Sequence, residues 1–319
     1  MAQRAETIPI VSRRGSSARR RREAIAGVLW ASPWLLGFFL FTFGPMVASL
    51  VLAFTDFTIS NLEPNVVGFA NFTRALSGTD HLFWPSLLRT LQYALVMVPL
   101  SIGGSLLAAM LLNQGMKLTT LFRTLFFLPS LTPVVASAVI WTWLYNPNWG
   151  FLNHLLGQAG VKGPLWLSDP DTAMPSLILV ALWGAIGGNT MIIFLAGLQG
   201  VPRELHEAAE IDGANGLQRF RAVTLPMISP TIFFNLVIGI IAALKVFATP
   251  VVMTSGGPSY ATWTFILHLY QTGFQAFDMG YASALAWIFM VIVVALTVVN
   301  LRLSKRWVYY EGEERRDDR

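Results

Sequence analysis

Long apolar stretches separated by short polar segments dominate this sequence. Intervals without Asp, Glu, Lys or Arg cover residues 24–55, 90–116, 124–161, 172–202, 222–244, 246–277 and 279–301. A helix needs about 20 apolar residues to cross the hydrocarbon core of a bilayer, and each interval can contain one. Once loops are trimmed, the pattern predicts six membrane-spanning helices, at Gly27–Phe54, Ser86–Asn113, Thr120–Tyr145, Pro175–Gln199, Pro226–Val252 and Tyr281–Leu303.

The segments between these spans predict loops. Residues 55–85, 146–174 and 253–277 fall on one side of the bilayer, and the last is expected to be a turn-rich loop because Gly256, Gly257 and Pro258 disfavour a regular helix. The alternation of apolar and polar positions typical of membrane β-strands is absent. The spans must therefore satisfy their backbone groups as helices, and the pattern predicts an all-α integral membrane protein.

Composition supports this interpretation and excludes several kinds of chemistry. Of the 319 residues, 54% are hydrophobic and only 12% charged, against roughly 25% charged in soluble domains. The chain has no cysteine, which excludes disulfides and thiolate nucleophiles. Its four histidines, His81, His154, His206 and His268, stand alone without a partner at metal-ligand spacing. We therefore predict no metal site and no catalytic residue, with each histidine in a loop or interface.

Cationic residues predict the orientation. With both termini on one side, 18 Lys and Arg residues lie on that side and three, Arg74, Arg89 and Lys162, on the other. Because cytoplasmic loops carry the excess of Lys and Arg, both termini are expected in the cytoplasm. Residues 1–25 and 305–319 would be tails of a membrane domain at 26–304. The Arg-rich N-terminal tail then serves as an orientation signal rather than a nucleic-acid site, and the first apolar run is too long for a cleaved signal peptide.

One charged segment, residues 200–225, separates the fourth and fifth predicted spans on the cytoplasmic side. Pro202 suits the start of a helix, because the amide that proline lacks would have no partner there. Acidic residues near the amino end, Glu204 and Glu207, favour the helix dipole. The pattern predicts a short helix over Arg203–Ile211.

The rest of this segment predicts a bend. Leu205, Ala208 and Ala209 fall at i, i+3 and i+4, a narrow face whose alanines allow another backbone to approach closely. Gly213 follows Asp212 and can end the helix in a left-handed conformation. A second helical stretch from about Leu217 completes a two-armed element. A plain solvated connector is the alternative, but it would not need this face beside a glycine.

The stretch EAAEIDGANGLQRFRAVTLP resembles the conserved cytoplasmic loop of bacterial ABC importer permeases. The family pattern has Glu-Ala-Ala, three residues, Gly, nine residues, an aliphatic residue, one more, then Leu-Pro. Val223 stands where the family often has Ile. The matching positions are Glu207, Ala208, Ala209, Gly213, Val223, Leu225 and Pro226.

The resemblance extends over nearly everything after the basic tail. Segments such as LTPVVASAVIWTWLYNPNWGFLN, TSGGPSYATWTFILHLYQTGF and MGYASALAWIFMVIV are similar to carbohydrate-type importer permeases of the maltose class, which handle oligosaccharides and sn-glycerol 3-phosphate. The six predicted spans favour the permease type that resembles lactose and glycerol-phosphate permeases.

This resemblance implies a mechanism and a set of partners. The bent loop would be a coupling helix seated in a cytoplasmic ATPase subunit, with Glu207 pairing with a basic residue, the alanines permitting close seating and Gly213 setting the bend. The partners implied are a second homologous permease, two ATPase subunits, an extracytoplasmic solute-binding protein and membrane lipid. The chain has no G-x-x-x-x-G-K-[ST] phosphate loop, so ATP and Mg²⁺ would be used by the partner ATPase and no cofactor is expected on this chain.

Polar and aromatic residues within the spans are candidates for a transport path, because polar groups in a membrane are costly. Lys245 is either a snorkelling residue at the end of a span or a pore residue that binds substrate. Asn189 and Asn235 could line a path or form interhelical hydrogen bonds. Three aromatic residues could stack on sugar rings or pack in the bundle: Trp183, Phe247 and Tyr270.

Two other classes of protein compete with an importer permease. A secondary transporter or channel usually has ionisable relays within its spans, and Lys245 stands nearly alone. A membrane-embedded enzyme would need convergent acids, histidines or a metal set, and none is found. The sequence does not identify the solute.

Overall fold

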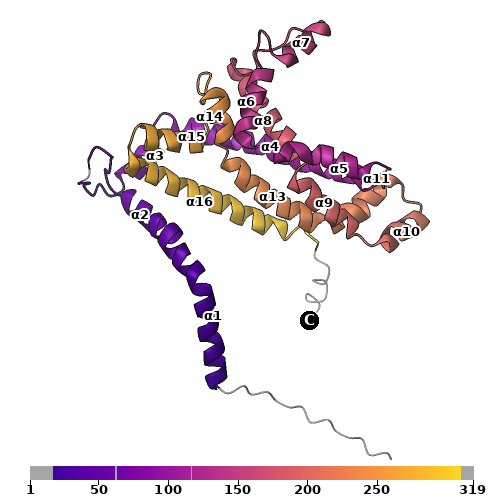
Figure 1. The fold of residues 1–319 in the computed structure, drawn as a ribbon, viewed down its shortest axis with the longest axis horizontal. Helices are drawn as coiled ribbons and strands as arrows, with labels where there is room; N and C mark the ends of the chain where they lie inside the picture. Colours follow the sequence, from indigo (N-terminus) through magenta and orange to yellow (C-terminus); the bar gives the residue numbers. More distant parts are fainter. Residues whose placement is uncertain (1–16, 62, 116, 310–319) are drawn as a thin grey trace, which may run out of the picture. The chain divides into compact units, whose positions relative to one another are not determined.

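The computed structural model describes residues 17–61, 63–115 and 117–309, and these are almost entirely helical (Figure 1). Within the described ranges, β-structure is limited to two isolated bridges, Thr55–Val66 and Thr58–Asn61. The chain divides into two units, Met1–Leu52 and Ala53–Arg319. The all-α prediction is confirmed.

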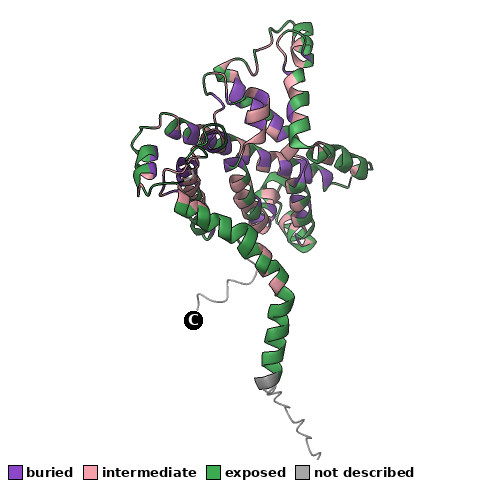
Figure 2. Cartoon of the chain, turned by 60° about the vertical axis from the view of Figure 1, so that its left-hand side comes forward, coloured by how far each residue is buried: buried purple, intermediate pink, exposed green. Residues whose placement is uncertain are grey.

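The described part of the first unit is one long helix. It comprises α1 (Ser17–Phe38), a π-helical turn at Phe39–Phe43 and α2 (Gly44–Leu52). Its stretch Arg19–Leu52, 34 residues long, is apolar enough to cross a membrane. The side chains are nearly all exposed (Figure 2). Residues 1–16 of the predicted basic tail and residues 310–319 lie outside the described ranges, whereas 17–25 already belong to the helix.

The second unit is built around α4 (Phe83–Leu112), which packs mainly against four of the other helices. These are α8 (Pro170–Ala185), α9 (Asn189–Gln199), α13 (Ser229–Leu244) and α15 (Phe265–Tyr270). The last long helix, α16 (Met279–Ser304), lies along α13. Small residues on α4, including Ser101, Ser105 and Ala109, are buried and let the neighbouring helices approach closely. This unit contains the purple, buried positions of Figure 2.

Three of the six predicted spans are broken helices. The third consists of α5 (Thr119–Phe127), a 3₁₀ turn at Leu128–Leu131 and α6 (Val134–Leu144), with a bend of 95°. The fourth bends by 49° between α8 and α9. In the described chain, three helices are long and apolar enough to cross a membrane, and six spans result if each bent pair counts as one.

The predicted bounds of the fifth span, Pro226–Val252, are wrong. A π-helical turn at Phe220–Thr224 and α12 (Leu225–Met227) meet α13 at a bend of 66°. The helix then ends at Leu244, and a separate helix, α14, covers Ala248–Thr254.

The predicted loop at 253–277 is only partly a loop. Turns around the predicted glycines cover residues 255–264, but α15 and a π-helical turn at Gln271–Gln275 follow. The expectation failed because Phe265–Tyr270 is apolar and has no breaker. Two further short helices were not predicted, α3 (Ala70–Leu76) and α7 (Phe151–Gln158).

Candidate coupling site and transport path

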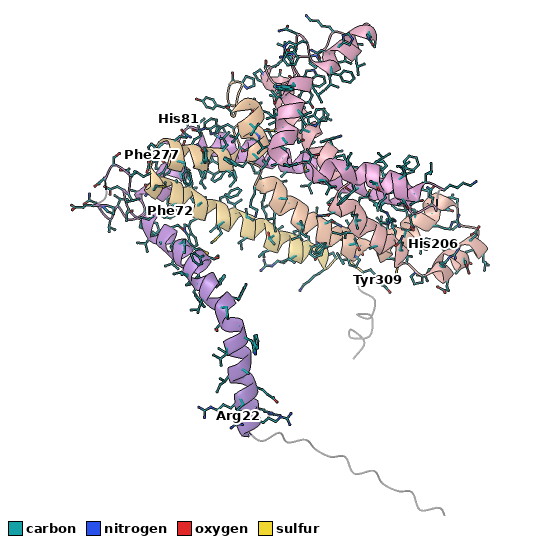
Figure 3. The ribbon with its side chains drawn as sticks, in the orientation of Figure 1. Arg22, Phe72, His81, His206, Phe277 and Tyr309 are labelled. Carbon is teal, nitrogen blue, oxygen red and sulfur yellow. The ribbon has the colours of Figure 1, made fainter. Side chains whose placement is uncertain are left out.

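The charged segment folds as the two short helices that the sequence predicted. The first, α10, runs from Arg203 to Ile211, with Pro202 immediately before it in an extended conformation. The second, α11, spans Gly216–Arg219. We call residues 203–219 the elbow. His206 marks the elbow in Figure 3, at the end of the second unit opposite Phe72, His81 and Phe277.

Backbone hydrogen bonds fix the bend of the elbow. Gly213 has φ +78°, in the left-handed region that favours glycine. Its N–H donates to the carbonyl of Glu210 at 3.0 Å, and the N–H of Ala214 donates to the carbonyl of Ala209 at 2.9 Å. These two bonds are the pair that define a Schellman cap. Gly213 therefore sets the direction in which the chain leaves α10, immediately after the C-cap residue Asp212.

Side chains hold the second arm against the first. The side chain of Asn215 accepts a hydrogen bond from the N–H of Gln218 at 3.0 Å, and Gln218 Oε1 accepts one from the N–H of Asn215 at 2.7 Å, which completes a capping box. Arg219 on α11 then forms an ion pair of 2.8 Å with Glu210 on α10. Since Glu210 is 69% exposed, this ion pair contributes at most about 1 kcal/mol to the stability of the bent elbow in the free chain.

One face of α10 is uncovered. Glu204, Glu207, Ala208 and Ile211 fall at i, i+3, i+4 and i+7, and all four are exposed. Ile211 is 86% exposed. The face predicted from the sequence shares Ala208 with this one; its other two members are Leu205, which is exposed, and Ala209, which is half-buried. The side chains of the uncovered face are therefore accessible to another protein.

The far end of the motif enters the core of the bundle. Thr224 is buried, and Val223 packs on a cluster formed by buried residues of α4 and α9. Pro226 lies in α12, which continues the π-helical turn at Phe220–Thr224 without a break. Leu225, beside it, is about one-third exposed. A force on the elbow therefore reaches the central helices through a short, continuous connection.

The candidates for a transport path lie in separate places. Lys245 is exposed at the C-terminal end of α13, so it is a residue at a helix end and not within a span. Asn189 is exposed at the first position of α9, directly after the break at 186–188. Asn235 is buried, and its amide donates to the carbonyl of Thr231 at 2.9 Å, which is an intrahelical role.

The three aromatic candidates divide into two groups. The rings of Phe247 and Tyr270 contact each other at 5.1 Å between centroids, and Phe274 continues the stack at 5.5 Å from Tyr270. Trp183 instead contacts Trp141 at 5.6 Å, edge to face. Only Phe247 and Tyr270 are brought together.

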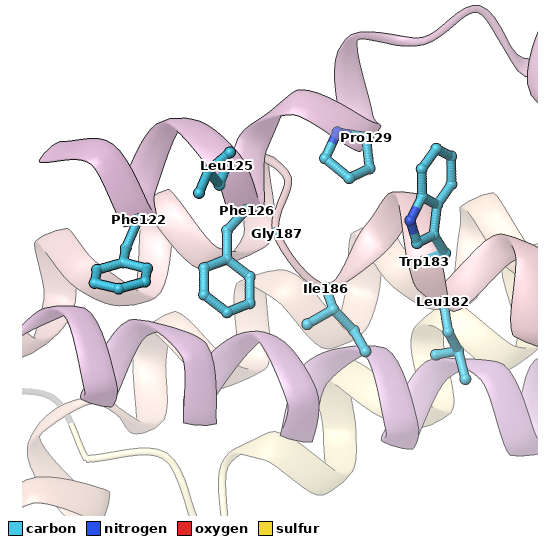
Figure 4. Close-up of a pocket in the computed structure, with 8 residues that line it drawn as sticks. All are labelled: Phe122, Leu125, Phe126, Pro129, Leu182, Trp183, Ile186 and Gly187. Atoms are coloured by element: carbon cyan, nitrogen blue, oxygen red, sulfur yellow. The ribbon is translucent and has the colours of Figure 1, made fainter. Parts of the chain in front are cut away.

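Trp183 also lines an apolar groove of about 520 Å³ between α5 and α8 (Figure 4). No charged side chain lines it, and the groove offers little hydrogen bonding to a sugar. Its lining residues are Phe122, Leu125, Phe126, Pro129, Leu182, Trp183, Ile186 and Gly187.

One histidine is not isolated as predicted. His268 on α15 is buried and lies 2.7 Å from a carboxylate oxygen of Asp80, a residue 188 positions earlier. Sequence spacing gave no sign of this pairing. Among the described residues, no group of three or more His, Cys, Asp or Glu side chains is placed to hold a metal ion.

Comparison with known proteins identifies the family. Residues 101–309 match the family described as binding-protein-dependent transport system inner membrane component. The chain belongs to this family. The permease is 41% identical over 298 residues to the probable ABC transporter permease protein YesP of Bacillus subtilis, with 92% of this chain and 95% of that relative covered.

Two further matches agree with this membership. The permease is 32% identical to the trehalose/maltose transport system permease protein MalF of Thermococcus litoralis, over 91% of this chain and 97% of that protein. A solved bacterial alginate ABC transporter, in complex with an alginate pentasaccharide-bound periplasmic protein, contains a chain of the same fold, with a TM-score of 0.78 at 22% identity, covering 91% of this chain and 96% of that one. The predicted resemblance to ABC importer permeases and the multi-pass membrane fold are confirmed.

Proposed function

We propose that this permease imports a sugar or sugar-like solute, of the oligosaccharide or glycerol-phosphate class, and is driven by ATP hydrolysis in partner subunits. It acts in a bacterial cytoplasmic membrane with both termini in the cytoplasm. Relatives named for trehalose/maltose and for sn-glycerol 3-phosphate transport support the solute class. A second homologous permease, two ATPase subunits and an extracytoplasmic solute-binding protein complete the complex.

The elbow carries this proposal. A rigid bend with an uncovered face of Glu204, Glu207, Ala208 and Ile211 suits a cleft in another protein, and its second arm leads directly into the core beside α4 and α9. Closure of the ATPase pair would pull the elbow and switch the bundle between inward-open and outward-open states. ATP and Mg²⁺ are used by the ATPase, and this chain holds no cofactor.

Reconstitution tests the proposal against a secondary transporter or channel. The full chain is purified with its ATPase subunits, second permease and solute-binding protein, and the complex is placed in liposomes. The solute-binding protein is first screened against labelled maltotriose, trehalose and sn-glycerol 3-phosphate. We expect uptake of the compound that the solute-binding protein binds only when Mg–ATP is present on the side of the membrane where the ATPase subunits lie. Uptake that continues without nucleotide, or that collapses with an ion gradient, contradicts the proposal.

A further inference from the structure

A buried carboxylate holds the end of the second unit opposite the elbow. Asp80 lies just before α4, where its Oδ1 accepts a hydrogen bond from the N–H of Leu82 at 2.9 Å. Its Oδ2 accepts one from the hydroxyl of Tyr281 on α16 at 2.6 Å and lies 2.7 Å from Nε2 of His268 on α15. The Asp80 and His268 side chains are only 11% and 7% exposed. One carboxylate thus joins three helices, and we call α3, residues 80–82, α15 and the first turn of α16 the corner.

The charge of Asp80 is well compensated. Burial acts to raise the pKa of its carboxyl, but the hydrogen bonds from Tyr281 and from the N–H of Leu82, with the charge and hydrogen bond of His268, outweigh burial and lower this pKa. Hydrogen bonds to an ionised carboxylate are shorter and stronger than those between neutral groups. The network is therefore a strong connection rather than a surface contact.

A second layer of charges surrounds this carboxylate. Arg74 on α3 pairs with Asp278 at 2.8 Å, and its guanidinium carbon lies 3.9 Å from the centroid of the Tyr281 ring. Asp278 in turn caps α16 by accepting a hydrogen bond from the N–H of Tyr281 at 3.2 Å. The hydroxyl and the ring of Tyr281 are thus both engaged.

Backbone contacts close the corner. The N–H of Gly280 donates to the carbonyl of Phe57 at 2.9 Å, and the N–H of Ile59 donates to that of Phe277 at 3.3 Å. A side chain at position 280 would collide with the backbone at 55–57, so only glycine allows this approach. Figure 3 shows Phe277 at this end of the unit, near Phe72 and His81.

The helices on the two sides of the turn at 255–264 pack against different neighbours. α14 packs against α6 and α8, whereas α15, ten residues later, packs against α4 and α16. The N–H of Phe265, where α15 begins, donates to the buried hydroxyl of Thr90 on α4 at 2.8 Å. This bond and the contact of His268 with Asp80 hold α15 beside the start of α4.

We propose that Asp80 is a positioning residue for transport: it holds α15 and the start of α16 against α4, so that the corner stays closed and moves as one body throughout the transport cycle. This inference rests on the proposed function. Bundle rearrangement then takes place at the helix breaks, not at this junction.

This chain has no cysteine, so a pair of cysteines introduced into it can test in the full complex whether the corner stays closed, with Mg–ATP as the probe. Ile59→Cys and Phe277→Cys replace two half-exposed side chains whose backbones are joined by a hydrogen bond of 3.3 Å. A disulfide between them requires Cα atoms about 4.4–6.8 Å apart. We expect the disulfide to form at the same rate, within about two-fold, without nucleotide and during Mg–ATP hydrolysis, and the oxidised complex to hydrolyse Mg–ATP at no less than about half its reduced rate. The single variants are the controls.

Loss of hydrolysis on oxidation, restored by a reductant, would overturn the inference while leaving the proposed function intact. A drop in disulfide formation of about ten-fold during hydrolysis would do the same. If the unaltered complex hydrolyses no Mg–ATP, the proposed function and the inference fall together.

Variants of the network test the role of Asp80. In the double-cysteine chain without nucleotide, Asp80→Ala should slow disulfide formation by about ten-fold, because charge-assisted hydrogen bonds are lost. Mg–ATP hydrolysis should fall with it and recover once the disulfide has formed, a rescue that a general folding defect would not show. Unchanged disulfide formation contradicts the positioning role.

Two milder variants, both at His268, test the same role if Asp80→Ala does not fold. His268→Gln retains a side-chain N–H for the carboxylate and should form the disulfide at the unaltered rate. His268→Ala removes that donor and should be slower by about five-fold. Equal rates in these two variants overturn the inference.

Discussion

Replacement of Gly213 by valine should uncouple the elbow without affecting membrane insertion. At φ +78°, a residue with a side chain costs about 1–2 kcal/mol, and a β-branched residue lies at the upper end. An added Cβ at this position meets no atom within 4 Å, so the effect is conformational and not a collision. A cost of this size lowers the ratio of bent to unbent elbow by about ten-fold.

The assay is Mg–ATP-driven uptake by the reconstituted complex, together with the amount of chain in the membrane. Gly213→Val should reduce uptake by about ten-fold at unchanged membrane content. Two controls are matched to it: Gly213→Asn, because asparagine tolerates the left-handed region, and Gly216→Ala, whose glycine has neither a positive φ nor a close neighbour. Both should retain most uptake. Normal transport by the valine variant, or an equal loss in Gly216→Ala, would show that the left-handed conformation of Gly213 does not matter for coupling.

Three further predictions follow from the same structure. Reversal of either charge, Glu210→Arg or Arg219→Glu, should lower Mg–ATP-driven uptake by no more than about five-fold, and the double exchange should restore it; an additive loss in the double variant counts against the ion pair. Because the pKa of Asp80 is lowered by folding, its carboxylate stabilises the chain above pH of about 4, and this contribution disappears as the pH falls through the lowered value. The Tm of Asp80→Asn should therefore lie below that of the unaltered chain by the largest amount near neutral pH, and the difference should shrink in acid. A difference that does not change with pH would contradict this role of the carboxylate. Tyr270→Ala should raise the half-saturating solute concentration in uptake assays, whereas Trp183→Leu should not, since Trp183 faces an apolar groove; the opposite pattern would place the path along α5 and α8.

The elbow could be predicted from the sequence because its determinants are local. Helix propensity, the acidic first turn and Gly213 act over fewer than a dozen residues, and the structure places α10 at Arg203–Ile211 as expected. The ion pair between Glu210 and Arg219 could not be predicted, since it depends on the angle of the bend.

The existence of the spans could be predicted better than their shape. Apolar length shows that a segment can cross a bilayer but not whether it bends, and the 95° bend between α5 and α6 occurs near Pro133, which the sequence marks only as a candidate for a break. Lys245 was placed inside a span for the same reason, because a second apolar interval, 246–277, begins directly after it.

The corner could not be predicted at all. Asp80 meets residues 188 and 201 positions away, and each of these residues alone reads as an ordinary loop or helix-end residue. Only the packing of α3, α15 and α16 around the start of α4 brings them together.

Contact between the elbow and an ATPase subunit tests the central claim most directly. Ile211→Cys introduces the only cysteine of this chain at a position of the elbow that is 86% exposed, where a thiol-reactive photo-crosslinker can be attached. In the full complex we predict a crosslink to the ATPase subunit that is equally specific before and during Mg–ATP hydrolysis, and none from a cysteine at the buried position Ala109. If the crosslinker at position 211 reacts only with water or lipid in a complex that transports, the elbow does not contact the ATPase and the proposed coupling is contradicted.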